Sequence, residues 1–171
     1  PDVRLAAINC QKFGADGITV HPRPDERHIR YSDVFEIKPV IITEFNIEGY
    51  PSEQFINLVL SVKPDQVTLV PDSPDVITSN AGWNTKKHLS FLKDIVSVFK
   101  ESGIRTSIFV SAEPEDIEYA ALAGADRVEL YTEPYARLYQ SDKQKAVEPF
   151  LKAAEKAKES GLGINAGHDL N

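Results

Sequence analysis

The chain has 171 residues, of which 42% are hydrophobic and 26% charged, proportions that suit one globular domain able to bury a sizeable core. Its formal charge of -7 argues against a protein that binds nucleic acid independently of sequence, because neutralising phosphates requires a net basic surface. Cys10 is the only cysteine, which excludes a disulfide framework, and it falls in an apolar helical pattern where we expect a packed thiol.

The sequence has no apolar run near the roughly 20 residues needed to cross a bilayer, and its first residues lack the pattern of a signal peptide. We therefore expect a cytoplasmic protein that does not bind membranes. The chain also lacks methionine and opens directly on a helical pattern, so we expect it to begin after its natural start.

Helical and extended patterns alternate along the chain. Apolar residues recur at helical spacing over residues 2–13, where Gly14 supplies a left-handed stop, and the β-branched residues 18–20 then form a short strand that ends at His21. The expected strands are 18–20, 44–48, 66–70, 105–111, 127–132 and 162–168, and the expected helices are 2–13, 32–37, one from residue 52, one from residue 85, 115–122 and one through 147–157.

This alternation is typical of a parallel sheet with crossover helices. In a parallel α/β barrel every strand runs the same way, so the residues that follow the strands gather on one rim, where such barrels hold their active sites. That rim would receive the polar residues His21, Glu48, Asp72, Ser111, Glu129 and His168.

Two histidines and a glutamate on one rim are suited to repeated proton transfer. Histidine titrates near neutrality, and a desolvated carboxylate has its pKa raised enough to act as a base. Arg23, two residues after His21, and the backbone amides after Gly167 could hold a phosphate or carboxylate group. A solvated, charged surface loop over residues 21–30 is the alternative.

The same histidines could instead bind a metal ion. His21 and His28 lie on one loop without the helical spacing of a typical metal-binding pair, so we expect no metal. The connection over residues 71–84 is polar and long enough for a binding loop or a lid, and an ordinary surface loop is the alternative.

Seven motifs spread over nearly the whole chain make it resemble the pyridoxine 5'-phosphate synthase family of vitamin B6 biosynthesis. They are Gly14-Ala-Asp-Gly-Ile-Thr-Val-His-Pro-Arg23, Arg27-His28-Ile29, Phe45-Asn-Ile-Glu48, Leu69-Val-Pro71, Ile77-Thr78-Ser79, Arg127-Val-Glu-Leu-Tyr-Thr132 and Asn165-Ala-Gly-His168.

The resemblance implies a (β/α)8 TIM barrel that condenses 1-deoxy-D-xylulose 5-phosphate with 3-amino-2-oxopropyl phosphate. The products would be pyridoxine 5'-phosphate, inorganic phosphate and water. It implies no metal or organic cofactor, and a homo-oligomer, an octamer built from dimers.

The resemblance also implies roles for individual residues. His21 is similar to the family's acid/base histidine, Glu48 to its carboxylate base, His168 to the proton donor of the late steps, and Glu129 to the acid that stabilises a transition state. The substrate-binding positions of the family fall on Arg23, His28, Thr78 and Asp169, the last through its backbone.

Two parts of the family pattern have no counterpart in the sequence. The family has a first strand with Asn, Asp and His residues before the opening helix, and a final pair of βα units whose Gly-His turn binds phosphate. We therefore expect residues 1–171 to form a single barrel domain that is incomplete at both ends.

Two other functions remain open. One is a different phosphosugar isomerase or aldolase on the same barrel, although no Schiff-base lysine stands out at a strand end. The other is a non-catalytic subunit that binds phosphorylated metabolites.

Overall fold

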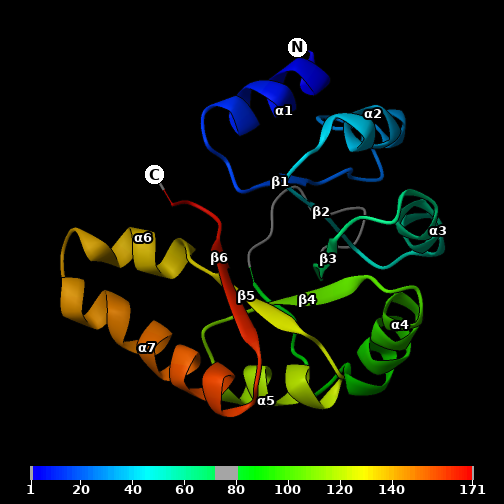
Figure 1. The fold of residues 1–171 in the computed structure, drawn as a ribbon. Helices are drawn as coiled ribbons and strands as arrows, with labels where there is room; N and C mark the ends of the chain where they lie inside the picture. Colours follow the sequence, from blue (N-terminus) through cyan, green and yellow to red (C-terminus); the bar gives the residue numbers. More distant parts are fainter. Residues whose placement is uncertain (1, 72–80, 171) are drawn as a thin grey trace.

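The computed structural model describes residues 2–71 and 81–170, and its strands form one curved parallel sheet (Figure 1). The strand order in the sheet follows the chain order. Among the described residues, β1 and β6 each pair with one neighbour, so the sheet is an open, curled half-barrel. The strands are β1 (Gly17–Val20), β2 (Glu44–Gly49), β3 (Gln66–Leu69), β4 (Arg105–Val110), β5 (Arg127–Tyr131) and β6 (Gly163–Gly167).

The helices surround the outer, convex face of this sheet (Figure 1). They are α1 (Val3–Lys12), α2 (Tyr31–Ile37), the short 3₁₀ helix η1 (Lys38–Val40), α3 (Glu53–Val62), α4 (Leu89–Glu101), α5 (Pro114–Leu122), α6 (Glu133–Tyr139) and α7 (Lys143–Glu159).

Side-chain caps fix where several helices begin. Asp2, Ser52 and Asp142 each accept a hydrogen bond from a first-turn amide, at 2.9, 3.2 and 3.0 Å, in α1, α3 and α7 respectively. The turns into β1 and β5 use Gly14 and Gly124, whose φ angles of 96° and 89° lie in the left-handed region that glycine enters without a steric cost.

The two faces of the sheet carry different kinds of side chain. Alternate residues of β2 and β3, such as Phe45, Ile47 and Val67, are completely buried against the helices and join the main core. The intervening residues, such as Asn46 and Gln66, project to the concave face. The apolar core therefore lies between the sheet and the helices, and the inside of the half-barrel is polar.

The expected alternation of strands and helices is confirmed, with differences at particular elements. Helix α4 begins at Leu89 rather than near Thr85, because the Thr85 hydroxyl donates to the carbonyl of Asp116 at 2.7 Å and holds residues 85–88 in a turn. Helix α6 was not expected from the sequence, where Glu133-Pro134 follows β5 directly.

The expectation that Cys10 is a packed thiol is wrong, because its side chain is exposed. Helix α1 lies over β1, which is an edge strand, and packs mainly against α2 and η1. Only Ala7 of α1 is fully buried, and Cys10 instead lines an apolar hollow between α1, β1 and α2.

Within residues 2–71 and 81–170, no helix combines the length and apolar character needed to cross a membrane.

Candidate active site

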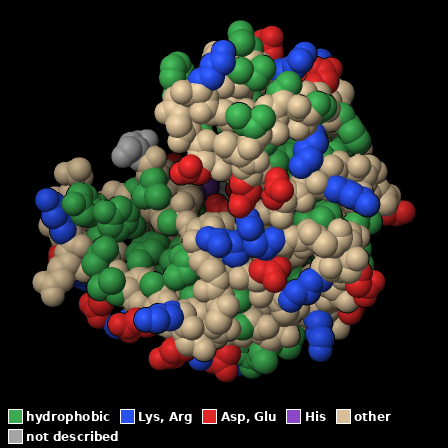
Figure 2. All heavy atoms as spheres, in the orientation of Figure 1, with side chains coloured by type: hydrophobic (Ala, Val, Ile, Leu, Met, Phe, Trp, Pro, Cys, Tyr) green, Lys and Arg blue, Asp and Glu red, His purple; other side chains and the backbone are tan. Residues whose placement is uncertain are grey.

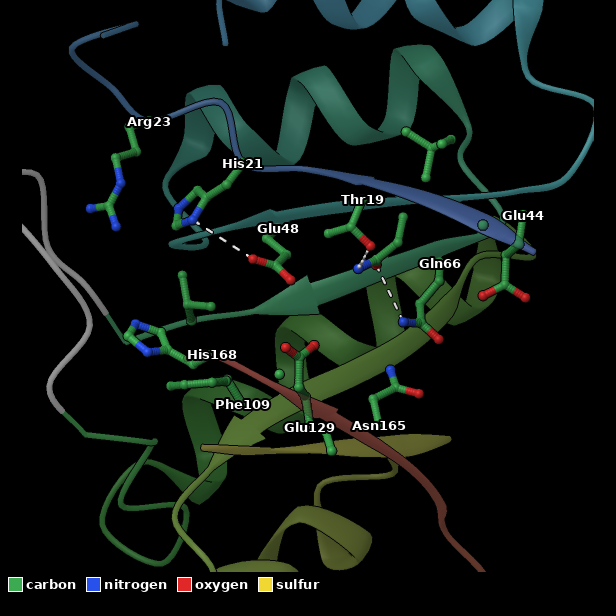
Figure 3. A pocket seen from close by; sticks show the side chains of 16 residues that line it. Thr19, His21, Arg23, Glu44, Glu48, Gln66, Phe109, Glu129, Asn165 and His168 are labelled. Atoms are coloured by element: carbon green, nitrogen blue, oxygen red, sulfur yellow. Dashed lines mark hydrogen bonds and ion pairs between the residues drawn. The ribbon is translucent and has the colours of Figure 1, made fainter. Parts of the chain in front are cut away.

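A cavity of about 460 Å³ occupies the concave face of the sheet (Figure 3). All six strands, or the turns that follow them, contribute to its lining. In Figure 2 it opens near the middle of the face shown, where acidic and basic side chains meet and a histidine is visible inside. Its polar lining residues include Thr19, His21, Arg23, Glu44, Asn46, Glu48, Gln66, Glu129, Asn165 and His168.

His21 and Glu48 form the first pair in this cavity. His21 directly follows β1, and Glu48 lies near the end of the neighbouring strand β2. The Nδ1 atom of His21 is 3.8 Å from Oε2 of Glu48, and both side chains are more than three-quarters buried, with exposed fractions of 23% and 21%. This separation is too long for a direct hydrogen bond, but it allows a proton to pass after a small movement or through one water molecule.

A second carboxyl group faces the first. Glu129 projects from β5, and Figure 3 shows the Glu48 and Glu129 side chains pointing toward one another across the cavity. Burial, followed by the negative charge of Glu129, raises the pKa of Glu48 to about 8, and Arg23 opposes the rise. Glu48 therefore carries a proton near neutral pH in the substrate-free protein.

The pKa of Glu129 is also raised by burial. A hydrogen bond from Thr68 and the nearby His168 both oppose this rise, because each favours the ionised form. The cavity thus holds two carboxyl groups whose proton affinities are shifted toward the pH at which general acids and bases work best.

His168 lies in the turn that follows β6, in a conformation with φ of 81°. The hydroxyl of Thr132 donates to the backbone carbonyls of Gly167, at 2.5 Å, and of His168. The imidazole ring packs edge-on against Tyr131, with ring centroids 5.0 Å apart, and its Nδ1 atom is 2.9 Å from Oδ2 of Asp169. These contacts hold the ring at the mouth of the cavity.

Of the other expected site residues that the structure describes, only Arg23 lines the cavity. Arg23 lines the cavity together with His21, Glu48, Glu129 and His168. His28 is exposed on the loop after β1 and is not part of the cavity lining. The side chain of Asp169 contacts His168 rather than the cavity.

The expected lid and the residues that follow β3 and β4 complete the comparison. Thr78, Asp72 and most of the expected lid over residues 71–83 lie outside the described residues. Ser111 follows β4 as expected, but its hydroxyl accepts a hydrogen bond from the Gly82 amide at 3.3 Å and does not line the cavity.

Sequence reasoning missed a layer of polar side chains that lies deeper in the half-barrel. Asn46 donates to the Thr19 hydroxyl at 3.3 Å and accepts from Gln66 and Thr68 at 3.3 and 3.2 Å. At the same end of the sheet, Arg105 forms hydrogen bonds with Gln66 and Glu44. Polar residues at alternate positions of buried strands were the signal that could have identified this layer.

Within the part of the chain that the structure describes, no group of three or more His, Cys, Asp or Glu side chains is arranged to hold a metal ion.

Solved structures with a similar fold support the barrel architecture. A mandelate oxidase variant with benzaldehyde superposes with a TM-score of 0.68 at 10% sequence identity, over 96% of this chain and 57% of that one. Mandelate oxidase with (S)-2-phenylpropionate gives a TM-score of 0.67 at 10% identity, with the same coverage of the two chains. At this identity the likeness concerns the fold alone.

Comparison at the sequence level is more specific. The chain is 64% identical to a pyridoxine 5'-phosphate synthase of Phocaeicola vulgatus and 63% identical to one of Bacteroides thetaiotaomicron, in each case over the whole chain and 72% of the relative. The family model described as "Pyridoxal phosphate biosynthesis protein PdxJ" matches residues 1–171. The chain therefore belongs to the PdxJ family of pyridoxal phosphate biosynthesis proteins.

Proposed function

We propose that this protein is a pyridoxine 5'-phosphate synthase, which condenses 1-deoxy-D-xylulose 5-phosphate with 3-amino-2-oxopropyl phosphate. The observation that carries the proposal is the match of the whole chain to the PdxJ family and to synthases at 63–64% identity. The polar cavity on the concave sheet face, with its two histidines and three glutamates, supports the same conclusion.

The proposed reaction requires several proton transfers at different atoms. The amine of one substrate attacks the ketone of the other, and the resulting hydroxyl leaves as water once it is protonated. Removal of protons from neighbouring carbons then permits loss of phosphate. The ring closes when a nucleophilic carbon adds to the remaining carbonyl, whose oxygen leaves as a second water. Acid and base groups on different sides of the substrate are needed, because one group cannot reach every position.

We assign these steps to groups of the cavity. Because the pKa of Glu48 is about 8, this residue begins the cycle protonated and first acts as an acid, then as a base once it has lost its proton. His21, 3.8 Å away, acts as its partner for proton exchange. Glu129 and His168, on the opposite side of the cavity, serve the later steps.

Arg23 is proposed to bind a substrate phosphate, because its guanidinium matches phosphate oxygens and it lines the cavity. We keep His28, Thr78 and the backbone of Asp169 as further substrate contacts on the basis of the family resemblance.

The experiment that tests the function is incubation of the purified protein with both substrates. We expect pyridoxine 5'-phosphate, followed by its absorbance, and release of inorganic phosphate, with no product from either substrate alone. Glu48→Gln should bind both substrates and abolish turnover. Tight phosphate binding without product from the unaltered protein would favour a non-catalytic subunit, and near-normal turnover by Glu48→Gln would remove Glu48 from its assigned role.

The finer architecture and assembly are also proposals. A closed eight-stranded barrel is supported by the outer edges of β1 and β6, which lack strand partners among the described residues. A homo-oligomer is supported by exposed apolar side chains, notably Phe13 and Ile42 at 87% and 88% exposure. Light scattering in solution would measure the mass. We keep the cytoplasm as the expected compartment because the proposed substrates are phosphorylated metabolites.

A further inference from the structure

Asn165 lines the cavity from β6, and the proposed function gives it no role. In the parallel pairing of β5 with β6 it lies beside Glu129, and its side chain projects from the same concave face of the sheet. It comes three residues before His168, so it lies deeper in the half-barrel than the mouth of the cavity. A molecule that contacts Asn165 must therefore reach past the mouth.

Arg127 determines which end of the Asn165 amide faces the cavity. The Nε atom of Arg127 donates to Oδ1 of Asn165 at 2.8 Å, and Nη2 donates to the backbone carbonyl of Ile164 at 2.9 Å. A guanidinium group has donors and no acceptor, so the amide oxygen rather than the nitrogen must face it. In Figure 3 the Asn165 nitrogen accordingly points into the cavity, and its oxygen points away from the cavity mouth.

The place of the Arg127 guanidinium depends on Gly163, its neighbour in the sheet register. A Cβ atom at Gly163 would lie 2.8 Å from Nη1 of Arg127, which is too close for either group to stay where it is. The missing side chain therefore leaves the space in which the guanidinium lies along β6. Gly163 and Arg127 together support one orientation of the Asn165 amide.

The nitrogen of this amide keeps its hydrogens available. Among the groups that the structure describes, it has no hydrogen-bond partner. The amide of Gln66 differs in this respect: its oxygen also accepts from an arginine, Arg105, at 2.9 Å, but its nitrogen donates to Asn46 at 3.3 Å. Of these two amides that an arginine orients, Asn165 is the one that can donate to a molecule in the cavity.

A neutral amide donor suits an uncharged oxygen better than it suits a phosphate. Figure 3 shows Arg23 on the same side of the cavity as His21 and His168, at the mouth, where its positive charge matches a phosphate group. A phosphorylated substrate held there extends its carbon skeleton toward the deeper residues. The oxygen that reaches Asn165 is therefore a carbonyl or hydroxyl oxygen of that skeleton.

We propose that Asn165 binds substrate by donating from its amide nitrogen to a carbonyl or hydroxyl oxygen, and that Arg127 is the positioning residue that holds the amide in this orientation. The inference rests on the proposed function, because it assigns a contact with a substrate of that reaction. The contact is present both before and during the chemical steps. Its loss should therefore weaken binding while the proton-transfer groups stay in place.

The first test measures kcat and the KM for each substrate in two variants. Asn165→Asp keeps an oxygen that accepts from Arg127 but replaces the donating NH2 group with a second acceptor, and Asn165→Ala removes the donor without adding charge. In both variants we expect the KM for one substrate to rise about tenfold or more, with kcat within about threefold of the unaltered value.

Asn57→Asp provides the matched control, because it adds the same charge on the exposed face of α3 and should leave kcat and both KM values unchanged. Unchanged KM values in Asn165→Asp and Asn165→Ala would overturn the proposal. A fall in kcat without a rise in KM would overturn it as well, because that result would mean that the substitutions act by disturbing Glu129.

Gly163→Ala tests the positioning role without altering Arg127 or Asn165. The added methyl group should displace the flexible end of Arg127 and free the amide to turn its oxygen toward the cavity. We expect the KM for the same substrate to rise about threefold or more, and no further rise when Gly163→Ala is combined with Asn165→Ala. An equal effect of Gly163→Ala with and without Asn165 would refute the positioning role and indicate a structural effect on β6.

The same measurements separate this inference from the proposed function. Product formation with KM values that do not respond to either Asn165 substitution would refute the role of Asn165 and leave the synthase function standing. Absence of product from the unaltered protein would refute the synthase function. In that case a weaker affinity of Asn165→Ala for 1-deoxy-D-xylulose 5-phosphate or 3-amino-2-oxopropyl phosphate, measured by calorimetry, would still support Asn165 as a ligand contact, and equal affinities would refute it.

Discussion

Replacing Glu48 with glutamine should stabilise the folded protein at alkaline pH while it abolishes turnover. The unfolded chain loses the Glu48 proton near pH 4.5, whereas burial and the charge of Glu129 keep the proton on the folded protein until about pH 8. Between these values the unfolded state binds fewer protons than the folded state. The free energy of unfolding therefore falls as the pH rises through this window.

The size of this effect follows from the same two pKa values. A rise from 4.5 to about 8 corresponds to about 5 kcal/mol of lost stability once the pH exceeds the folded-state value. We treat this as an upper bound, because relaxation of the cavity and water around a side chain that is 21% exposed reduce the cost. Glutamine cannot ionise, so the free energy of unfolding of Glu48→Gln should not fall in this way as the pH rises.

The assay is urea unfolding of both proteins at about pH 5 and at about pH 9. We expect similar free energies of unfolding at the lower pH and a gain of several kcal/mol for Glu48→Gln at the higher pH. Glu155→Gln, on the exposed face of α7, serves as the control and should show no such pH-dependent gain. A difference between Glu48→Gln and the unaltered protein that is the same at both pH values would refute the argument.

Three further substitutions test other parts of the structure. In Gly167→Ala the new methyl carbon would overlap Oε1 of Glu129, so we expect that carboxyl group to be displaced and kcat to fall at least about tenfold; an unchanged kcat would contradict this. Ser52→Ala should lower the free energy of unfolding by about 1 kcal/mol through loss of the α3 cap, measured in urea, and a change below a few tenths would show that the cap is unimportant. Trp83→Phe should cost about 1–3 kcal/mol by the same measurement, because the carbonyl of Leu69 loses its 3.1 Å hydrogen bond to the indole; an equal stability would mean that another donor replaces it.

Much of the fold could be predicted because its signals are local. The β-branched run 18–20, the Ser52 cap and the glycine stops each act within a few residues, and the corresponding strands and helices are present. The exposure of Cys10 could not be predicted from its local pattern, because it follows from the position of α1 over an edge strand of the sheet. Helix α6 was missed because its seven residues are too short to show clear periodicity.

The candidate site was predictable to the extent that it follows from strand ends. His21, Glu48 and His168 lie near the ends of strands or in the turns that follow them, and in a parallel sheet these ends share one rim. Glu129 lies in the middle of β5 and reaches the same cavity because its side chain is on the concave face. Their roles in catalysis remain proposals. The raised pKa of Glu48 was foreseen from desolvation, but its second cause, the charge of Glu129, depends on strands β2 and β5 facing each other across a curved sheet.

The alternating composition of the strands explains why the inside of this half-barrel holds a polar cavity. Parallel strands are usually buried on both faces, which makes their sequences almost continuously apolar, and branched side chains usually fill the interior of such barrels. Strand β2 instead reads Glu-Phe-Asn-Ile-Glu-Gly, with each polar residue followed by an apolar one until Glu48. Its apolar residues pack against the helices, and its polar residues line the cavity or the layer below it. Period-two alternation in a parallel strand is thus itself an indication of a functional interior, because stability alone would favour an apolar residue at Asn46, Thr68 and Glu129.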